Sequence, residues 1–417
     1  MFNIDEIRNQ FPMLKNNKDL IYFDNSSTTF KPYSVIKAVE DYYRNYSVNY
    51  GRGEYDLSFL LDAKIDAARK TVADFINANE NEIVFTSNTT VGLNTIAFGY
   101  GGKFLQKDDI ILITEAEHAS NVLPWIKIAE RTGATIRYIP LTDTGEISLE
   151  GLKKMLAENV KIVSVAQITN VLGYIAPLQE IVEAAHKAGA IVIVDGAQSA
   201  GHIAVDVKKI NCDFFVFSGH KMCGPTGVGV LYGKYELLQK TDAYTYGGGS
   251  NVNYTKTFEI FLKDPPYKFE SGTVMIEAIL GLSEAIRFIK NIGLDEIYEH
   301  IKKLHRYAIR QLSTIEHIHL YAPDATCGII AFNIKNVFAD DAAKYFNSHK
   351  LCIRSGQHCS RLLQERLNCI SSLRASLYFY NTLEEVDRFI EICKSATKKN
   401  CVEFIFNNLA RTVHDDF

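Results

Sequence analysis

The sequence predicts an α/β protein with a large domain, built on a mainly parallel sheet covered by helices, and a smaller α+β domain. In the first half of the chain, short and continuously apolar runs alternate with amphipathic helix-like stretches, which is typical of strands buried on both faces. The pattern changes after Tyr235. With 417 residues, 47% of them hydrophobic and 23% charged, the chain has ordinary globular composition and can fill two cores.

The elements of the large domain follow one another in a regular order. Helices are expected around 89–100, 120–132, 149–159 and 178–189. The strand-like runs are EIVFT, DIILIT, ATIRYIPL, KIVSVAQ, IVIVD, DFFVF and GVGVLY. Residues 244–273 are rich in Gly, Asn, Thr and Pro and predict a long functional loop or hairpin. A long helix is expected from Val274.

The second set of elements predicts the smaller α+β domain. Its strand-like runs are HIHLYA, GIIAFNI, KLCIRS and SLRASLYF, and a helix follows from Thr382. We assign residues 20–290 to the large domain, and residues 1–19 with 291–401 to the small one. Residues 402–417 form a C-terminal extension, either an added helix or a docking tail.

Charge and hydropathy exclude several classes of protein. The formal net charge is −4 and the basic residues are scattered, so nucleic acid is not an expected partner. The N-terminus has no secretory signal pattern, and no apolar run approaches the roughly 18 residues of a membrane span. We therefore expect a soluble, cytoplasmic protein with no membrane partner. No strand is followed by GxGxxG and no P-loop is complete, which disfavours a dinucleotide-binding dehydrogenase.

The eight cysteines form no CxxC pair and no regular framework, so metal and disulfide interpretations are weak and no metal site is expected. Most are expected to be small buried hydrophobic residues. Cys359 is the exception, because of the motif around it.

Lys221 and Asp195 indicate the chemistry. Each follows a strongly apolar run, DFFVF for the lysine and IVIVD for the aspartate, so both are expected at the carboxyl edge of the sheet, where open α/β folds bind ligands. A lysine there can form a Schiff base with pyridoxal 5'-phosphate, and a carboxylate can keep the pyridine nitrogen protonated. Taken singly, a surface lysine or a helix-capping aspartate would be the ordinary interpretation.

Six motifs in order carry a resemblance to a known family. They are AEHASNVLPW, QITNVLG, VDGAQS, SGHKMCGPTGVGVLYG, RSGQHCS and LRASLYFYNT. Together, from about Tyr22 to about Cys393, the chain resembles the group II (SufS-type) cysteine desulfurases among the class V aminotransferase-like enzymes of fold type I. The resemblance implies a seven-stranded-type sheet in the large domain.

The resemblance also implies roles in binding the cofactor. Lys221 is the Schiff-base lysine, Asp195 the partner of the pyridine nitrogen, and His118 the plate stacked on the ring. Gln198 and Asn170 are implied to bind near the ring hydroxyl. The phosphate is implied to lie at the start of a helix, among Thr89, Thr90, Ser218, His220 and, from the neighbouring subunit of a homodimer, Thr273.

For the reaction, the resemblance makes Cys359 the nucleophile that takes sulfur from L-cysteine as a persulfide and leaves L-alanine. Arg354 and His358 stand near Cys359 in the chain and would favour its thiolate if their side chains reached it. Arg374 is implied to bind the substrate carboxylate, with Arg354 and Asn170 lining the same site. A soluble acceptor protein would carry the sulfur to iron–sulfur cluster or other thio-cofactor assembly.

Some positions depart from the family pattern. Val274-Met275 replaces Pro-Asn, Gly51 to Tyr55 lacks two histidines, and Cys223 replaces an aromatic residue. Selenocysteine lyase and cysteine sulfinate desulfinase therefore stay open as alternatives, as do other enzymes of this fold, including a sulfur-independent transaminase. A non-catalytic sulfur-transfer partner is disfavoured, because Lys221, Asp195 and Cys359 are all present.

Overall fold

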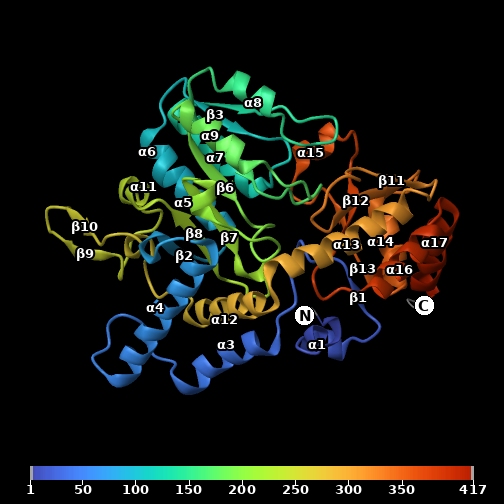
Figure 1. Ribbon diagram of the computed structural model, residues 1–417, viewed down its shortest axis with the longest axis horizontal. Coiled ribbons are helices and arrows are strands. Elements are labelled where there is room, and N and C mark those ends of the chain that lie inside the picture. The colour runs from blue at the N-terminus through green and yellow to red at the C-terminus, as the bar shows by residue number, and fades with distance from the viewer. Residues whose placement is uncertain (1–2, 415–417) are drawn as a thin grey trace.

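The computed structural model describes residues 3–414 and is organised around a seven-stranded sheet (Figure 1). The strand order is β2-β8-β7-β6-β5-β3-β4. All neighbouring strands are parallel except that β8 runs antiparallel to both β2 and β7. The predicted fold class is confirmed. The strands are β2 (Ile83–Thr86), β3 (Ile110–Ile113), β4 (Thr135–Tyr138), β5 (Val160–Ala166), β6 (Ile191–Asp195), β7 (Phe214–Ser218) and β8 (Gly229–Gly233).

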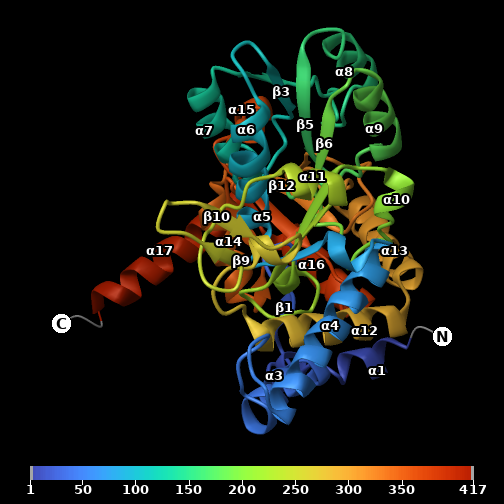
Figure 2. The same cartoon turned by 90° about the vertical axis from the view of Figure 1, so that its left-hand side faces the viewer.

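Helices cover both faces of this sheet because its central strands are apolar on both sides. Along β7, Phe215 and Phe217 enter one core and Val216 the other, as the two-residue period of a strand requires. Figure 2 shows α8 and α9 on one side of β5 and β6, and α6 and α7 on the other. The covering helices are α3 (Tyr33–Asn45), α4 (Asp56–Ile76), α5 (Thr89–Ile96), α6 (Gly102–Phe104), α7 (Leu123–Thr132), α8 (Leu149–Met155), α9 (Leu178–Lys187), α10 (Val207–Ile210), α11 (Tyr235–Lys240) and α12 (Ile276–Ile292).

A second, antiparallel sheet with the order β11-β12-β15-β14 forms the centre of the smaller unit. Phe332, Phe346 and Phe389 are fully buried at its core. The N-terminal strand β1 pairs with β13 of this unit. The bounds are β1 (Ile21–Tyr22), β11 (Ile318–Leu320), β12 (Ile329–Ile334), β13 (Leu351–Cys352), β14 (Arg354–Gly356) and β15 (Ser372–Ser376), with α1 (Ile4–Arg8), α2 (Pro12–Asn16), α13 (Leu294–Leu312), α14 (Ala339–Ser348), α15 (Arg361–Arg366) and α16 (Leu383–Ser395). The predicted domain boundaries stay predictions.

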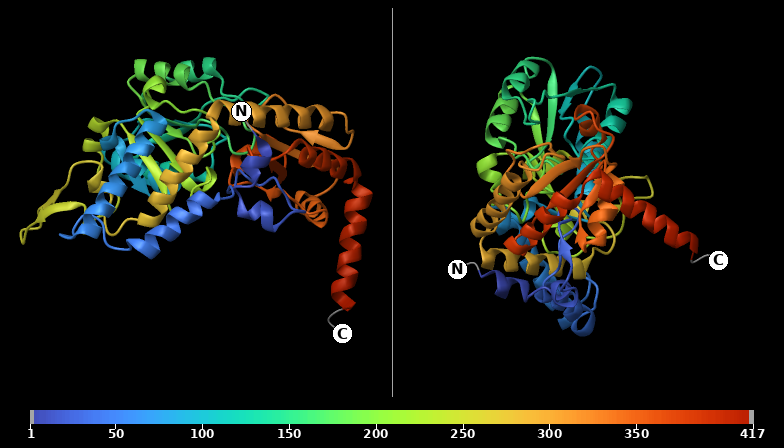
Figure 3. Two further views of the ribbon diagram at one scale, coloured as in Figure 1. Left: turned by 60° about the horizontal axis from the view of Figure 1, so that its bottom comes forward. Right: turned by 90° about the vertical axis from the view of Figure 1, so that its right-hand side faces the viewer.

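Two segments project from the body. The predicted loop or hairpin contains a hairpin of β9 (Asn251–Tyr254) and β10 (Ile260–Leu262), and Figure 3 shows it at the opposite end of the molecule from the C-terminal helix α17. This helix, Lys398–His414, begins four residues before the predicted extension and points away from the body. Within residues 3–414, no helix combines the length and apolar character needed to cross a bilayer.

Candidate active site

A pocket of about 350 Å³ lies at the carboxyl ends of the parallel strands, and the two sheets contribute to its walls. Every site residue predicted from the sequence lines this pocket except Thr273. The predicted residues that come from the large sheet or its loops are Thr89, Thr90, His118, Asn170, Asp195, Gln198, Ser218, His220 and Lys221. Those that come from the smaller unit are Arg354, Cys359 and Arg374.

Lys221 and Asp195 come to the pocket from neighbouring parallel strands. Asp195 ends β6, and Lys221 ends the 3₁₀ turn that follows β7. Burial raises the pKa of Asp195, against a hydrogen bond from the Ala197 N–H (2.9 Å) and the charge of Lys221. Burial lowers the pKa of Lys221 to about 8, although Asp195 opposes this shift. Because a neutral amine is the nucleophilic form, Lys221 is suited to bind a carbonyl group near neutral pH.

His118 follows β3 and lies at the start of a 3₁₀ turn, Ala119–Asn121. The Ser120 N–H donates to its Nδ1 at 3.1 Å, which leaves the proton of a neutral ring on Nε2. Burial lowers its pKa to about 4, with further lowering by Lys221, Arg374 and Arg354. The ring is therefore uncharged at neutral pH, and the stacking of its face on a cofactor ring stays a prediction.

Hydroxyl groups gather at the N-terminus of α5. The Thr89 N–H donates to Ser218 Oγ at 2.8 Å, and the hydroxyls of these residues are 2.6 Å apart. Thr90 and Ser120 form a second hydroxyl pair at 2.7 Å. Burial lowers the pKa of His220 to about 4, so it is a neutral hydrogen-bonding group. A helix N-terminus with several hydroxyls suits a phosphate.

The two predicted amides connect segments of the pocket wall. Gln198 Nε2 donates to the Ser26 carbonyl at 2.9 Å. Asn170 donates to the His358 carbonyl at 2.8 Å and accepts from the Ser360 hydroxyl at 2.9 Å, so both ends of its side chain hold the loop that carries Cys359. Contacts of these amides with the cofactor remain predictions.

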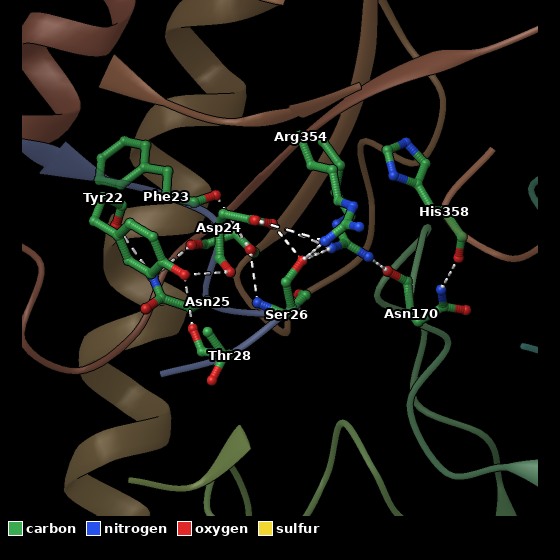
Figure 4. A network of polar contacts seen from close by, with 12 residues as sticks. Tyr22, Phe23, Asp24, Asn25, Ser26, Thr28, Asn170, Arg354 and His358 are labelled. Atoms are coloured by element: carbon green, nitrogen blue, oxygen red, sulfur yellow. Dashed lines mark hydrogen bonds and ion pairs between the residues drawn. The ribbon is translucent and has the colours of Figure 1, made fainter. Parts of the chain in front are cut away.

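Two arginines lie side by side on neighbouring strands of the smaller sheet. Arg354 on β14 pairs in register with Arg374 on β15, and both donate to the Ser27 hydroxyl, at 2.6 and 2.9 Å. Asp24 lies 3.8 Å from Arg354 and 3.4 Å from Arg374, and Figure 4 labels Asp24 and Arg354 within this network. Burial lowers the pKa of Arg374 to about 10, against the charge of Asp24, so the guanidinium stays charged and can bind a carboxylate.

Asp24, Ser26 and Ser27 were not identified from the sequence. The available signal was the polar run DNSST, which follows the short apolar run IYF. Nothing local connects that run to Arg374, about 350 residues away. The contact exists because Asp24 forms a bridge with Ser376, just beyond Arg374 on the same strand.

Cys359 is the only exposed cysteine of the eight, all of which lie within the described residues. It lies between β14 and α15 with φ of 55°, and His358 before it has φ of 51°. Such left-handed backbone is uncommon for non-glycine residues. The Cys359 carbonyl accepts a hydrogen bond from the Ala119 N–H at 2.7 Å. The segment thus joins the loop of His118 directly, and Cys359 lines the pocket of Lys221.

The expectation that His358 favours the Cys359 thiolate is wrong in this structure. The His358 ring bonds to the Ser372 carbonyl at 3.0 Å, and burial lowers its pKa to about 3. A neutral ring engaged with β15 supplies no positive charge to the thiol. Lys221 and Arg374 are two cations that interact electrostatically with Cys359.

Thr273 lies in a different pocket of about 570 Å³. The walls of this pocket come from the loop between α3 and α4, from α4 itself and from the base of the β9–β10 hairpin. Two of the departures from the family pattern, Gly51-Arg52 and Val274, line it. Cys223, the third, is fully buried with φ of 63°, and its N–H donates to the Thr29 hydroxyl at 2.7 Å.

Comparison with known proteins agrees with this geometry. The family model described as aminotransferase class-V matches residues 21–389. A probable cysteine desulfurase of Halalkalibacterium halodurans is 43% identical over 92% of this chain and 96% of its own length. One from Staphylococcus aureus is 41% identical over 97% and 99%.

Solved structures give the same result. The apo cysteine desulfurase of Thermococcus onnurineus superimposes with a TM-score of 0.90 at 36% identity, covering 95% of this chain and 98% of that one. The cysteine desulfurase CsdA of Escherichia coli, solved with an S-sulfonic acid, gives a TM-score of 0.89 at 31% identity over the same shares of the two chains.

Proposed function

We propose a reaction for Cys359 from the premise that this chain is a cysteine desulfurase of the class V aminotransferase family. In this reaction Cys359 receives the sulfur of L-cysteine as a persulfide and releases it to an acceptor protein. The cofactor of the enzyme is pyridoxal phosphate and its substrate is L-cysteine. The observation that carries the proposal is that the exposed Cys359 lines the same pocket as Lys221 and the two arginines.

The residues of the pocket fit pyridoxal phosphate. Lys221 Nζ has no hydrogen-bond or ion-pair partner among residues 3–414, so it is available for a covalent bond to the cofactor aldehyde. Asp195 is a buried carboxylate on the adjacent strand, and Thr89, Thr90 and Ser218 supply hydroxyls for the phosphate. When bound, the cofactor withdraws electrons from the α-carbon of the substrate.

In the proposed reaction, Arg374 and Arg354 orient L-cysteine through its carboxylate. Lys221, as a free amine, would remove the α-proton as a base and hold it for later return. The Cys359 thiolate then attacks the substrate Sγ, so that a sulfur–sulfur bond forms while the Cβ–Sγ bond breaks. The electron pair of the broken bond stays with carbon. Cβ takes a proton, Lys221 returns a proton to Cα, and the products are L-alanine and the Cys359 persulfide.

Cys359→Ser tests this proposal. The variant should bind pyridoxal phosphate and L-cysteine as the native enzyme does and release no sulfide or alanine above background, measured together in the presence of a thiol reductant. Cys352→Ser is the matched control, because Cys352 is partly buried in β13 outside the pocket, and it should retain turnover. If Cys359→Ser keeps most of its turnover, the persulfide mechanism is wrong.

We also propose a homodimer with composite active sites. The β9–β10 hairpin carries exposed apolar side chains, including Val252, Tyr254 and Phe258, which is 94% exposed, and such groups indicate a protein contact. Thr273 lies at the base of this hairpin, outside the pocket of Lys221, so contact with a cofactor phosphate requires a second chain. Thr273→Val should weaken cofactor retention roughly tenfold, the loss of about one neutral hydrogen bond. A monomeric, fully active enzyme would contradict this.

The acceptor is proposed to be a soluble protein in a reducing compartment, the cytoplasm. Two observations support this: Cys359 is exposed, so a persulfide on it can be attacked by another thiol, and all eight cysteines are free thiols.

A further inference from the structure

A fully buried ion pair lies beneath the segment that carries Thr273. Arg69 on α4 and Glu270 form two hydrogen bonds of 2.8 Å, and their side chains are 4% and 3% exposed. The Arg69 guanidinium also lies 4.6 Å from the centroid of the Phe85 ring and 5.4 Å from that of Tyr267. Both charges are thus desolvated and held in one orientation.

The pair joins three separate parts of the chain. Arg69 donates to the Ile83 carbonyl at 2.6 Å, and the Phe85 N–H donates to Glu270 at 2.8 Å. Helix α4, strand β2 and the segment after the hairpin are therefore fixed together at one point. Apolar side chains of similar volume stabilise a core as well as a buried ion pair does, so stability alone does not explain this choice. The directional geometry of the pair explains it, because a two-pronged contact fixes both the position and the rotation of the Glu270 carboxylate.

Three residues beyond Glu270 the chain reaches Thr273. On the way, Ser271 donates to the Thr245 hydroxyl at 2.8 Å and the Gly272 N–H donates to the Gly248 carbonyl at 2.7 Å. Gly272 has φ of 78°, a conformation that a side chain disfavours. These contacts connect the base of the hairpin to the same anchor, so little freedom is left between Glu270 and Thr273.

We propose that Arg69 and Glu270 are positioning residues for the active site of the neighbouring subunit: they hold the Gly272-Thr273 segment in the orientation that reaches the cofactor phosphate there. This inference rests on the composite dimer proposed above. It assigns to a buried pair in one subunit an effect on cofactor binding in the other.

Two variants separate positioning from folding. Glu270→Gln removes the charge and one prong of the contact, and Arg69→Met/Glu270→Leu replaces the pair with apolar side chains. The double variant should keep the melting temperature and the dimer, yet bind pyridoxal phosphate roughly tenfold more weakly, as Thr273→Val does. Asp74→Asn is the matched control, because it breaks the exposed Lys70–Asp74 pair on the same helix and should leave cofactor binding unchanged. Native affinity in the double variant overturns the inference.

Mixed dimers give the sharper test, read from the absorbance of covalently bound cofactor. When a Glu270→Gln subunit is paired with a Lys221→Ala subunit, the remaining lysine receives Thr273 from an intact segment, and binding should be native. When a native subunit is paired with a Lys221→Ala/Glu270→Gln subunit, the remaining lysine receives Thr273 from the loosened segment, and binding should weaken roughly tenfold. Equal affinity in the two arrangements overturns the inference.

The same pair of dimers made with Thr273→Val in place of Glu270→Gln distinguishes the two proposals. If Thr273→Val shows the asymmetry and Glu270→Gln does not, the positioning role fails and the composite site stands. If neither shows it, the composite site fails, and the positioning role fails with it.

Discussion

Capture of pyridoxal phosphate by the apo enzyme should follow the ionisation of Lys221. Burial lowers the pKa of this amine from 10.5 to about 8. The neutral fraction at pH 7 is then about 0.09, against about 0.0003 for an unperturbed lysine, a gain of about 300-fold in reactive amine. Because the neutral form attacks the aldehyde, the rate should rise with pH up to about 8 and level off above it.

The assay mixes apo enzyme with pyridoxal phosphate between pH 6 and 10 and records the initial rate of appearance of the lysine-bound chromophore. Two variants should move the inflection in opposite directions. Arg374→Gln removes a cation that lowers the pKa of Lys221, so the inflection should rise, while Asp195→Asn removes the carboxylate that raises this pKa, so it should fall. Titration of the free cofactor is the same in both experiments and cannot produce opposite shifts. A rate that keeps climbing to pH 10, or parallel shifts in the two variants, would refute the reasoning.

Three other predictions concern separate parts of the molecule. Borohydride reduction of the holoenzyme should leave the cofactor on a peptide containing Lys221, and recovery on another lysine contradicts the assignment. Arg374→Lys should raise KM for L-cysteine about 10- to 100-fold with cofactor content unchanged, because lysine cannot form the two-pronged contact; an unchanged KM refutes the carboxylate role. Phe389→Ala should lower the free energy of unfolding by about 3–5 kcal/mol in urea denaturation and spare cofactor content, since Phe389 is fully buried among Phe23, Phe332 and Phe346; a loss below 1 kcal/mol would contradict its place in the core.

The fold was predictable from sequence where burial on both faces makes a strand continuously apolar, as in IVIVD and DFFVF. The direction of β8 was not predictable from its sequence, because its residues are as buried as those of the parallel strands. Its antiparallel pairing follows from the connection of residues 219–228 between β7 and β8, which is too short for a parallel crossover.

Some residues of the candidate site could likewise be placed from the sequence, and others could not. Asp195 and Lys221 could be placed together because each follows a strand in the chain and parallel strands end at one edge. Arg354 and Arg374 could be placed only through the family resemblance, since their pairing depends on the register of β14 against β15. Neighbouring positions in the sequence are not enough to predict a contact: His358 directly precedes Cys359, but in the left-handed backbone of this loop its ring bonds to the Ser372 carbonyl on β15.

The interpretation of the pH profile depends on which other groups titrate near Lys221. Burial lowers the pKa of His118 and His220 to about 4 and that of His358 to about 3, so these rings stay neutral throughout pH 6–10. Glu117, which interacts electrostatically with Asp195, is different: burial raises its pKa to about 8, against hydrogen bonds from Thr114 and Asn121. Glu117→Gln therefore decides the assignment: an inflection that stays near pH 8 belongs to Lys221, and one that disappears belongs to Glu117 and would refute the role given to the Lys221 amine.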